Sequence, residues 1–114
     1  MADFQTRTVI LADRSPVQRD LCCSILQETG CRVIQTAMAS DLPAMARVYR
    51  PDLIVIGITR PADIEIRSIQ QLRDDPNSAA IPLLIVGVAR HKEMTAAFEA
   101  GADRASAWED PWTI

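Results

Sequence analysis

Three short apolar runs of this chain end in residues that could bind a ligand or take part in chemistry. These residues are Asp13, Arg14, Gly57, Arg60, Gly87 and Arg90. A carboxylate can ligate a hard cation, and several guanidinium groups around one cleft can hold an anion such as a nucleotide or a phosphate. Each arginine taken alone is more simply interpreted as a solvated loop residue, so the elements that position these residues decide between the two interpretations.

The other reactive residue types do not form a metal-binding pattern. Cys22, Cys23 and Cys31 are odd in number and lack the C-x-x-C spacing. The adjacent Cys22 and Cys23 lie in a segment of helical period, and we interpret them as small buried or half-buried residues. Because His91 is the single histidine, a zinc site is not expected.

Composition and charge describe one soluble domain. The chain has 114 residues, of which 48% are hydrophobic and 24% charged, and its net charge is −3. It is long enough for one compact core, and it has no apolar run of the roughly 20 residues that span a bilayer. The amino terminus lacks a signal-peptide layout, so a cytoplasmic location without membrane contact is expected. The negative net charge also argues against direct binding to nucleic acid.

Four apolar runs have the length and composition of buried strands. They are Thr8–Ala12, Arg32–Ala37, Asp52–Gly57 and Pro82–Val88, and a weaker fifth candidate follows Gly101 in ADRASAW. Three of the four are nearly continuous in apolar residues. This pattern is typical of a parallel sheet that is covered on both faces.

Segments of helical period alternate with these strands. The first begins at Ser15-Pro16-Val17-Gln18, a capping box with proline at the first helical position, and ends before Gly30. Its apolar stripe consists of Val17, Leu21 and Ile25.

Three further helices are expected. The first runs over about Asp41–Tyr49. The second has Ile66, Ile69 and Leu72 on one stripe and stops before Asp75. The third runs over about Lys92–Ala100 and should bury Met94, Ala97 and Phe98.

This alternation predicts an open, doubly wound α/β fold with a parallel sheet. In such folds, ligands bind outside the carboxyl ends of the strands, where the strand order reverses. Those ends are Ala12-Asp13, Gly57 and Gly87-Val88-Ala89. The residues with binding potential should therefore gather at one edge of the sheet.

The chain resembles the receiver domain of two-component response regulators from near its amino terminus to Pro111. The resemblance rests on ILAD followed by RSPVQRDL, on PDLIVIGITRP, on IPLLIVGVA and on AFEAGADRA. It implies a flavodoxin-like sheet of five parallel strands in the order 2-1-3-4-5. It also implies a single receiver-like domain over residues 1–114, either alone or as the N-terminal part of a longer protein.

Several residues that perform the phosphoryl chemistry of that family are replaced. The phosphorylated aspartate corresponds to Gly57, which has no atom that can attack a phosphoryl group. The acidic pair that holds magnesium is reduced to Ala12 and Asp13, and one carboxylate is a poor magnesium site. The switch hydroxyl corresponds to Gly87. The other replacements are Asp110 for the lysine, Ala105 for the switching aromatic, and Ile64 and Glu65 for the usual acid and glycine after M-P-x-M.

The joint loss of these groups, with the strand and helix patterns intact, indicates a degenerate receiver, or pseudo-receiver. We expect a non-enzymatic module without cofactor or metal that binds a protein partner independently of phosphorylation. That partner would be another signalling protein or an output domain of the same protein.

Other interpretations of the same residues remain open. In a small-anion or nucleotide sensor, the glycines would leave an empty pocket, and Arg14, Arg60 and Arg90 would contact the ligand. A receiver phosphorylated elsewhere is disfavoured because Asp13 and Asp52 have the wrong location. Taken singly, the glycines are compatible with drift at a disused site, and Asp13 with an ordinary loop carboxylate.

The end of the chain generates a separate expectation. Two residues follow Trp112, so the fifth helix of receivers should be missing or truncated. Apolar side chains from Val9 through Val55 would then lie partly open to water. We expect a second copy, a partner's helix or further chain to cover them, with Trp108 and Trp112 folding back as the alternative. In a symmetric dimer, Ile25 would lie near the contact with Val9 and Val55.

Overall fold

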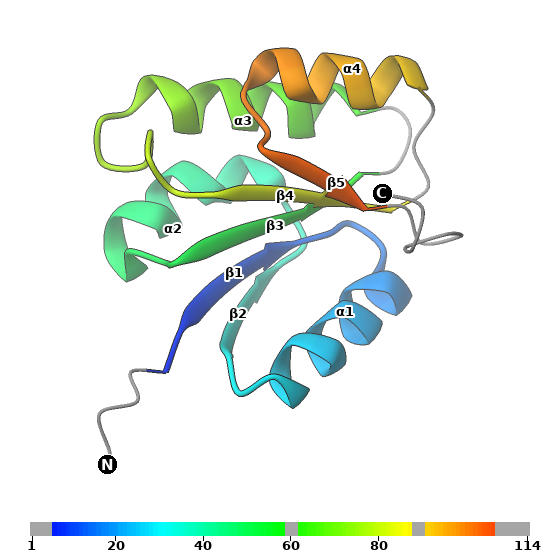
Figure 1. Ribbon diagram of the computed structural model, residues 1–114, viewed down its shortest axis with the longest axis vertical. Coiled ribbons are helices and arrows are strands. Elements are labelled where there is room, and N and C mark those ends of the chain that lie inside the picture. The colour runs from blue at the N-terminus through cyan, green and yellow to red at the C-terminus, as the bar shows by residue number, and fades with distance from the viewer. Residues whose placement is uncertain (1–5, 59–61, 88–90, 107–114) are drawn as a thin grey trace.

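Five parallel strands form a single twisted sheet in this protein (Figure 1). The computed structural model describes residues 6–58, 62–87 and 91–106, with the backbone alone at 91–94 and 104–106. The strands are β1 (Thr8–Ala12), β2 (Arg32–Thr36), β3 (Leu53–Gly57), β4 (Leu83–Val86) and β5 (Arg104–Ser106). Their order is β2-β1-β3-β4-β5, so the predicted fold class, strand order and weak fifth strand are confirmed.

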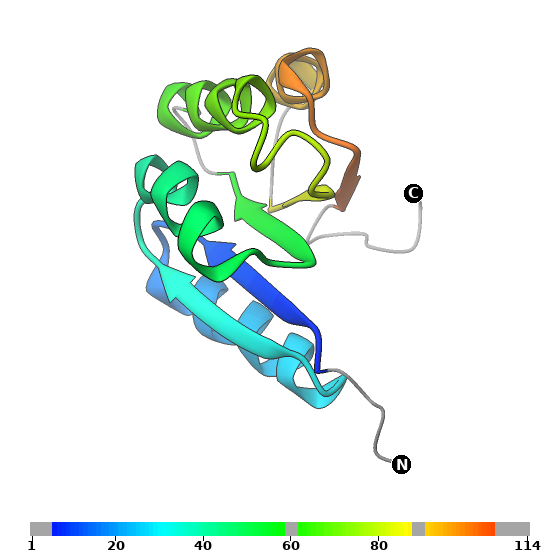
Figure 2. The ribbon, with the colours of Figure 1, turned by 90° about the vertical axis from the view of Figure 1, so that its left-hand side faces the viewer.

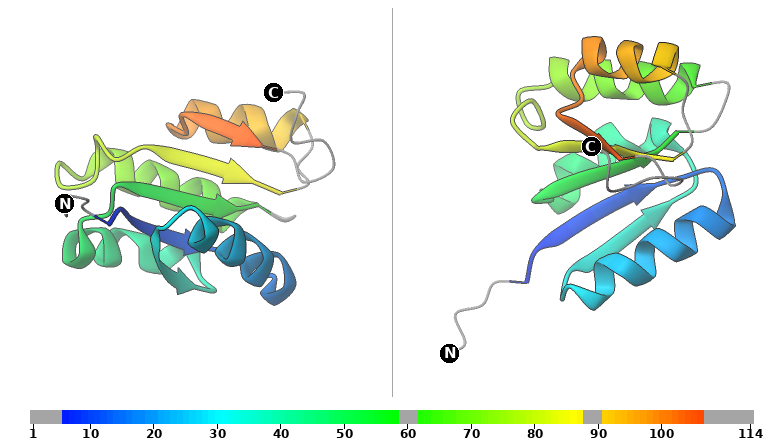
Figure 3. Two further views of the ribbon diagram at one scale, coloured as in Figure 1. Left: turned by 60° about the horizontal axis from the view of Figure 1, so that its bottom comes forward. Right: turned by 45° about the vertical axis from the view of Figure 1, so that its right-hand side comes forward.

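Helices cover both faces of the sheet (Figures 2 and 3). One face carries α1 (Pro16–Glu28). The other carries α2 (Leu42–Tyr49), α3 (Asp63–Asp74) and α4 (His91–Ala100), with a short 3-10 helix, η1 (Ala39–Asp41), directly before α2. No helix among the described residues is long and apolar enough to cross a membrane.

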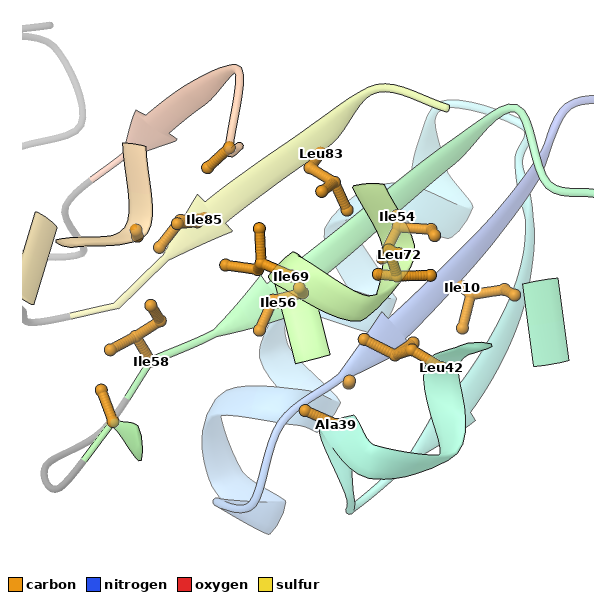
Figure 4. Close-up of a cluster of buried hydrophobic side chains, with 14 of the residues drawn as sticks. Ile10, Ala39, Leu42, Ile54, Ile56, Ile58, Ile69, Leu72, Leu83 and Ile85 are labelled. Atoms are coloured by element: carbon orange, nitrogen blue, oxygen red, sulfur yellow. The ribbon is translucent and has the colours of Figure 1, made fainter. Parts of the chain in front are cut away.

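The two faces of the sheet bury separate hydrophobic clusters because successive side chains of a strand point to opposite sides. Even-numbered residues of β1 and β3, such as Ile10, Ile54 and Ile56, pack against α2, α3 and α4 (Figure 4). The odd-numbered Val9 and Val55 pack in a second cluster with Cys22 and Cys23 of α1. The expectation that these two cysteines are buried is therefore confirmed.

The second cluster corrects one expectation. Val9 and Val55 were expected to lie partly open to water, but both are buried. The cluster also includes Leu11, and the half-buried Leu26 of α1 packs against it. The segment in which a fifth helix was expected to be truncated, with its two tryptophans, lies outside the described residues.

Hydrogen bonds at the start of α1 hold this helix in its orientation relative to β1. The Ser15 hydroxyl accepts a hydrogen bond from the Gln18 backbone N–H at 3.3 Å, as the predicted capping box requires. In a complete capping box, the Gln18 side chain would also accept the Ser15 N–H. Here that N–H donates to Asp13 Oδ1 at 2.9 Å instead. The Arg19 guanidinium also donates to the Asp13 carbonyl oxygen at 2.7 Å. These bonds tie the first turn of α1 to the end of β1.

With this orientation, the predicted apolar stripe of α1 faces solvent. Val17 is 78% exposed, Leu21 53% and Ile25 48%, so the interpretation of these residues as the buried face is wrong. The helix instead buries Cys22 and Cys23, which lie nearly opposite the stripe on a helix of 3.6 residues per turn.

The remaining helices follow the sequence pattern with one exception. Ile69 and Leu72 of α3 are fully buried, and Ile66 of the same stripe is partly buried. In α4, Ala97 is buried as expected, but Phe98 is exposed. Ala97 belongs to the same hydrophobic cluster as Ile69 and Leu72 of α3, so this helix buries the alanine and not the adjacent aromatic residue. The side chain of Met94 lies outside the described part of the structure.

Arg73 connects α3 to the edge of the sheet at β5. Its Nε donates to the Gly101 carbonyl oxygen at 2.8 Å, and its Nη1 to the Ile81 carbonyl oxygen at 2.7 Å. Its Nη2 lies 2.7 Å from Asp103 Oδ2, which also accepts the Leu83 N–H. One guanidinium therefore satisfies acceptors from two separate loops.

Substituting Arg73 should destabilise the fold far more than substituting an exposed arginine of the same helix. We expect Arg73→Ala to lower the free energy of unfolding by about 2–4 kcal/mol, because several carbonyls and a carboxylate lose a charged donor. The control, Arg67→Ala on the exposed side of α3, should change it by about 0.5 kcal/mol or less. Urea unfolding measures both, and equal effects would contradict the role assigned to Arg73.

Candidate functional site at the carboxyl ends of β1 and β3

The predicted site lies where the strand order reverses, between β1 and β3. Ala12 pairs with Thr36 of β2 on one side and with Ile56 of β3 on the other, so Asp13 and Gly57 are neighbours at the carboxyl edge of the sheet. Asp13 is 1% exposed. Its backbone N–H extends the pairing with β2 by donating to the Thr36 carbonyl oxygen at 3.1 Å.

The Asp13 carboxylate fills the space above Gly57. A Cβ atom added at position 57 would overlap the carboxylate and would lie 3.0 Å from the Cβ of Asp13. Oδ1 accepts the Ser15 N–H, whereas Oδ2 is buried without a hydrogen-bond partner. The prediction that Gly57 leaves an empty pocket is therefore wrong at this position, because the glycine provides room for a neighbouring side chain.

The environment of Asp13 opposes its ionisation. Burial raises the pKa of this carboxyl group above its usual value, and this effect outweighs the opposing influence of the Ser15 N–H and of the charges on Arg19 and Arg14. The group is held in place by the chain and is poorly solvated.

Arg14 forms an ion pair with Glu65 in the first turn of α3. Arg14 Nε lies 2.9 Å from Glu65 Oε2, and its Nη2 donates to Oε1 at 3.5 Å. The Glu65 side chain is almost fully buried, whereas that of Arg14 is about one-third exposed. The arginine that was predicted to contact a ligand is thus paired with a carboxylate of the protein itself.

Sequence reasoning had assigned no role to Glu65, although a signal was present. Glu65, Ile69 and Leu72 follow the i, i+4, i+7 spacing of one helix face, and all three are buried. A carboxylate on a buried stripe requires a partner, since an isolated buried charge is costly. Arg14, Arg60 and Arg90 each follow a strand end and were candidates for this partner, and the structure pairs Glu65 with Arg14.

Gly87 follows β4 with a φ of 122°, a backbone conformation that side chains rarely adopt. A hydroxyl-bearing residue at this position would be strained in the present backbone. Ala12 is buried and offers no ligand atom, and the backbone of Ala105 lies in β5. The other predicted site residues, Arg60, Arg90 and Asp110, lie outside the described residues.

The site offers little for metal or nucleophilic chemistry. Within residues 6–58, 62–87 and 91–106, no three His, Cys, Asp or Glu side chains are placed to hold a metal ion. Burial, reinforced by the charge of Asp13 and by Cys23, raises the pKa of the Cys22 thiol to about 11, so it is not a thiolate at neutral pH.

A cleft of roughly 610 Å³ lies at the opposite, amino end of β3 and β4. Its lining residues are Ala46, Arg47, Arg50, Pro51, Pro76, Asn77 and Ile81. This hollow therefore contains none of the residues that the sequence predicted as ligand contacts.

Comparison with known proteins identifies the fold. No protein-family model matches the chain. The protein PilH of Pseudomonas aeruginosa is 28% identical over 78 residues, which cover 68% of this chain and 64% of PilH. The chain thus matches less than two-thirds of that relative's length.

Solved structures match over more of the chain. The chemotaxis response regulator CheY4 of Vibrio cholerae superposes with a TM-score of 0.80 and 19% identity, covering 91% of this chain and 88% of that one. The receiver domain of a sensor histidine kinase from Pseudomonas aeruginosa superposes with a TM-score of 0.81 and 19% identity, covering 91% of this chain and 86% of that one. This chain has the receiver fold of two-component response regulators, with glycine at the end of its third strand.

The contact between Asp13 and Gly57 can be tested by a double-mutant cycle. We expect Gly57→Ala to lower the free energy of unfolding by about 1–3 kcal/mol, because the added methyl group displaces a held carboxylate. In an Asp13→Ala background the cost should be smaller, since most of the overlapping atoms are gone. If Gly57→Ala lowers the free energy of unfolding equally in both backgrounds, the two residues do not compete for one space.

The raised pKa of Asp13 predicts a distinct pH dependence. Its protonated form is favoured in the folded state, so its contribution to stability is full below the unfolded pKa and is lost as pH rises through the folded value. Asp13→Asn does not titrate and keeps an acceptor for the Ser15 N–H. The stability of wild type relative to Asp13→Asn should therefore fall as pH rises from about 3 to 7. Urea unfolding across this range measures the difference, and a rise would contradict the assignment.

Proposed function

We propose that this chain is a phosphorylation-independent pseudo-receiver that acts by binding a protein partner in bacterial signal transduction. The observation that carries this proposal is the placement of the Asp13 carboxylate over Gly57. In receivers, the residue at this strand end is the aspartate that accepts the phosphoryl group. Here a glycine replaces it, and a neighbouring carboxylate fills its space.

Among the described residues near this edge, neither Asp13 nor Cys22 is suited to act as a substitute nucleophile. Asp13 has one oxygen bonded to the Ser15 N–H and the other turned towards the Gly57 backbone, so neither is directed to an incoming phosphoryl group. The Cys22 thiol is protonated at neutral pH. We therefore infer that the domain is not an enzyme and undergoes no phosphoryl transfer at this edge.

A divalent cation does not fit the donor set at this edge. Ala12 and Gly57 have no side-chain oxygen, so among residues 12, 13 and 57 only Asp13 supplies a carboxylate. The positive charges of Arg14 and Arg19 act on this carboxylate and would oppose a cation. Magnesium usually requires one or two carboxylates together with phosphate oxygens, so we expect no magnesium-dependent activation.

Binding to a protein is the activity that a receiver fold retains without phosphoryl chemistry. The partner would be another signalling protein or an output domain, and a cytoplasmic location follows from such a role. The net charge of −3 gives the domain no general attraction to nucleic acid. The similarities to PilH and CheY4 support a role in signalling. That this chain binds such a partner is part of the proposal.

The alternative, a small-anion sensor, is less well supported. It required an empty pocket at Gly57, but the Asp13 carboxylate fills that space and would repel an anion. It also required Arg14 as a ligand contact, whereas Arg14 is paired with Glu65. Arg60 and Arg90 lie outside the described residues and add no support.

Phosphoryl donors should leave the protein unchanged. Incubation with acetyl phosphate or beryllofluoride and magnesium should give no aspartyl-phosphate mass shift and no change in amide hydrogen exchange near residues 13 and 57. A receiver that accepts phosphate from acetyl phosphate serves as the positive control. A stoichiometric adduct, in particular one that persists in Asp13→Asn, would overturn the proposal.

Restoring the nucleophile alone should not restore phosphorylation. In Gly57→Asp, the new carboxylate would overlap Asp13 and repel it, so stability should fall. The lysine, the hydroxyl and the second acid would still be missing, and such groups act as a unit. Mass spectrometry after acetyl phosphate treatment checks the outcome; phosphorylation of this single mutant would show that the remaining residues are competent.

A further inference from the structure

The solvent-facing side of α1 carries a row of apolar side chains. Val17, Leu21 and Ile25 are separated by four residues each and are about half to three-quarters exposed. Single exposed apolar residues are common, but three along one line of a helix form a continuous strip. Among the described helices, α1 is alone on its face of the sheet (Figures 1 and 3). The exposure of the three side chains places the strip on the side of α1 that faces solvent.

The ends of α1 lack the charges that stabilise an isolated helix, and its carboxyl end carries an unfavourable one. Its first turn has no acidic residue, and its last turn has no basic residue. Its last residue is Glu28, which is exposed. A negative charge at the carboxyl end of a helix is unfavourable, whereas the same charge near a helix amino terminus is favourable. An antiparallel neighbour of the same kind would correct both ends.

We propose that α1 pairs in antiparallel orientation with α1 of a second copy, about a twofold axis that passes beside Leu21. A twofold interface must be self-complementary, and the strip has this property because Val17 and Ile25 are equally spaced from Leu21. Leu21 then meets its own copy, and Val17 meets Ile25. Glu28 of each copy lies beside the first turn of the other α1.

This surface differs from the dimer that the sequence predicted. There the contact was expected to cover Val9 and Val55 on the sheet, but both are buried against α1 within one chain. The proposed contact uses the opposite side of the same helix. It does not depend on the loss of phosphorylation, so the two proposals can fail separately.

The expected dimer is weak. A single helix face supplies less than the roughly 800 Å² per partner of a standard interface. We therefore expect a dissociation constant in the range of about 10–100 μM. At a twofold axis, each substitution changes both copies, so one charge in the strip should have a large effect.

Analytical ultracentrifugation of the 114-residue chain from about 5 to 500 μM tests the proposal. Wild type should change from monomer to dimer over this range, and Val17→Asp should raise the dissociation constant by roughly 100-fold. Val48→Asp is the matched control, because Val48 is 73% exposed on α2, and it should dimerise as wild type does. Circular dichroism checks that both variants fold.

Disulfide formation tests the register independently. In a Cys31→Ser background, Leu21→Cys should form an intermolecular disulfide on mild oxidation, whereas Val48→Cys should not. Glu28→Lys should weaken the wild-type dimer, since it places like charges near the partner's helix amino terminus. A monomer at 500 μM, a dimer that Val17→Asp leaves intact, or cross-linking through position 48 in place of 21 would each overturn the proposal.

Discussion

The carboxyl edge of this protein is organised around one side chain, the carboxylate of Asp13. The backbone N–H of Asp13 extends the pairing of β1 with β2. In its side chain, Oδ1 accepts the N–H of Ser15, the residue that caps α1, and Oδ2 lies against Gly57. Any side chain at position 57 must displace this carboxylate. The glycine is therefore part of the packing at this edge, and it cannot be explained as a missing atom alone.

The Arg14–Glu65 pair completes this arrangement. A receiver that switches needs groups at the strand ends that are held ready for a phosphoryl group. Here the Arg14 guanidinium, next to Asp13, is paired with the buried Glu65 of α3. The pair joins the loop after β1 to a helix on the face of the sheet that α1 does not cover. Breaking such a pair would leave a buried charge uncompensated, which commonly costs about 3–5 kcal/mol. The pair therefore satisfies the buried Glu65 carboxylate within the chain.

Much of the fold could be predicted from the sequence because its determinants are local. Continuous apolar runs mark strands that are covered on both faces, and the Ser15-Pro16 start of α1 is a local signal. The orientation of α1 could not be read from its apolar pattern, since two opposite faces were both apolar enough to be buried. The bonds from Ser15 and Arg19 to Asp13 select the cysteine face.

The site itself was only partly predictable for a related reason. The absence of a nucleophile at Gly57 can be read from one position, but the use of the vacated space depends on the rotamer of Asp13. The partner of Arg14 depends on the approach of α3, whose first turn comes about 50 residues later in the chain. Phe98 was misjudged because the period of α4 does not show which of the two adjacent apolar residues, Ala97 or Phe98, faces the core.

The Arg73 contacts have a consequence for how the chain assembles. The acceptors of its guanidinium follow it by 5 to 30 positions and lie in the loop after α3 and in the turn before β5. The bonds to Gly101 and Asp103 can form only when α4 has brought the turn before β5 against α3, so the full set of bonds requires the assembled half. The carboxyl-terminal half should therefore unfold as one cooperative unit.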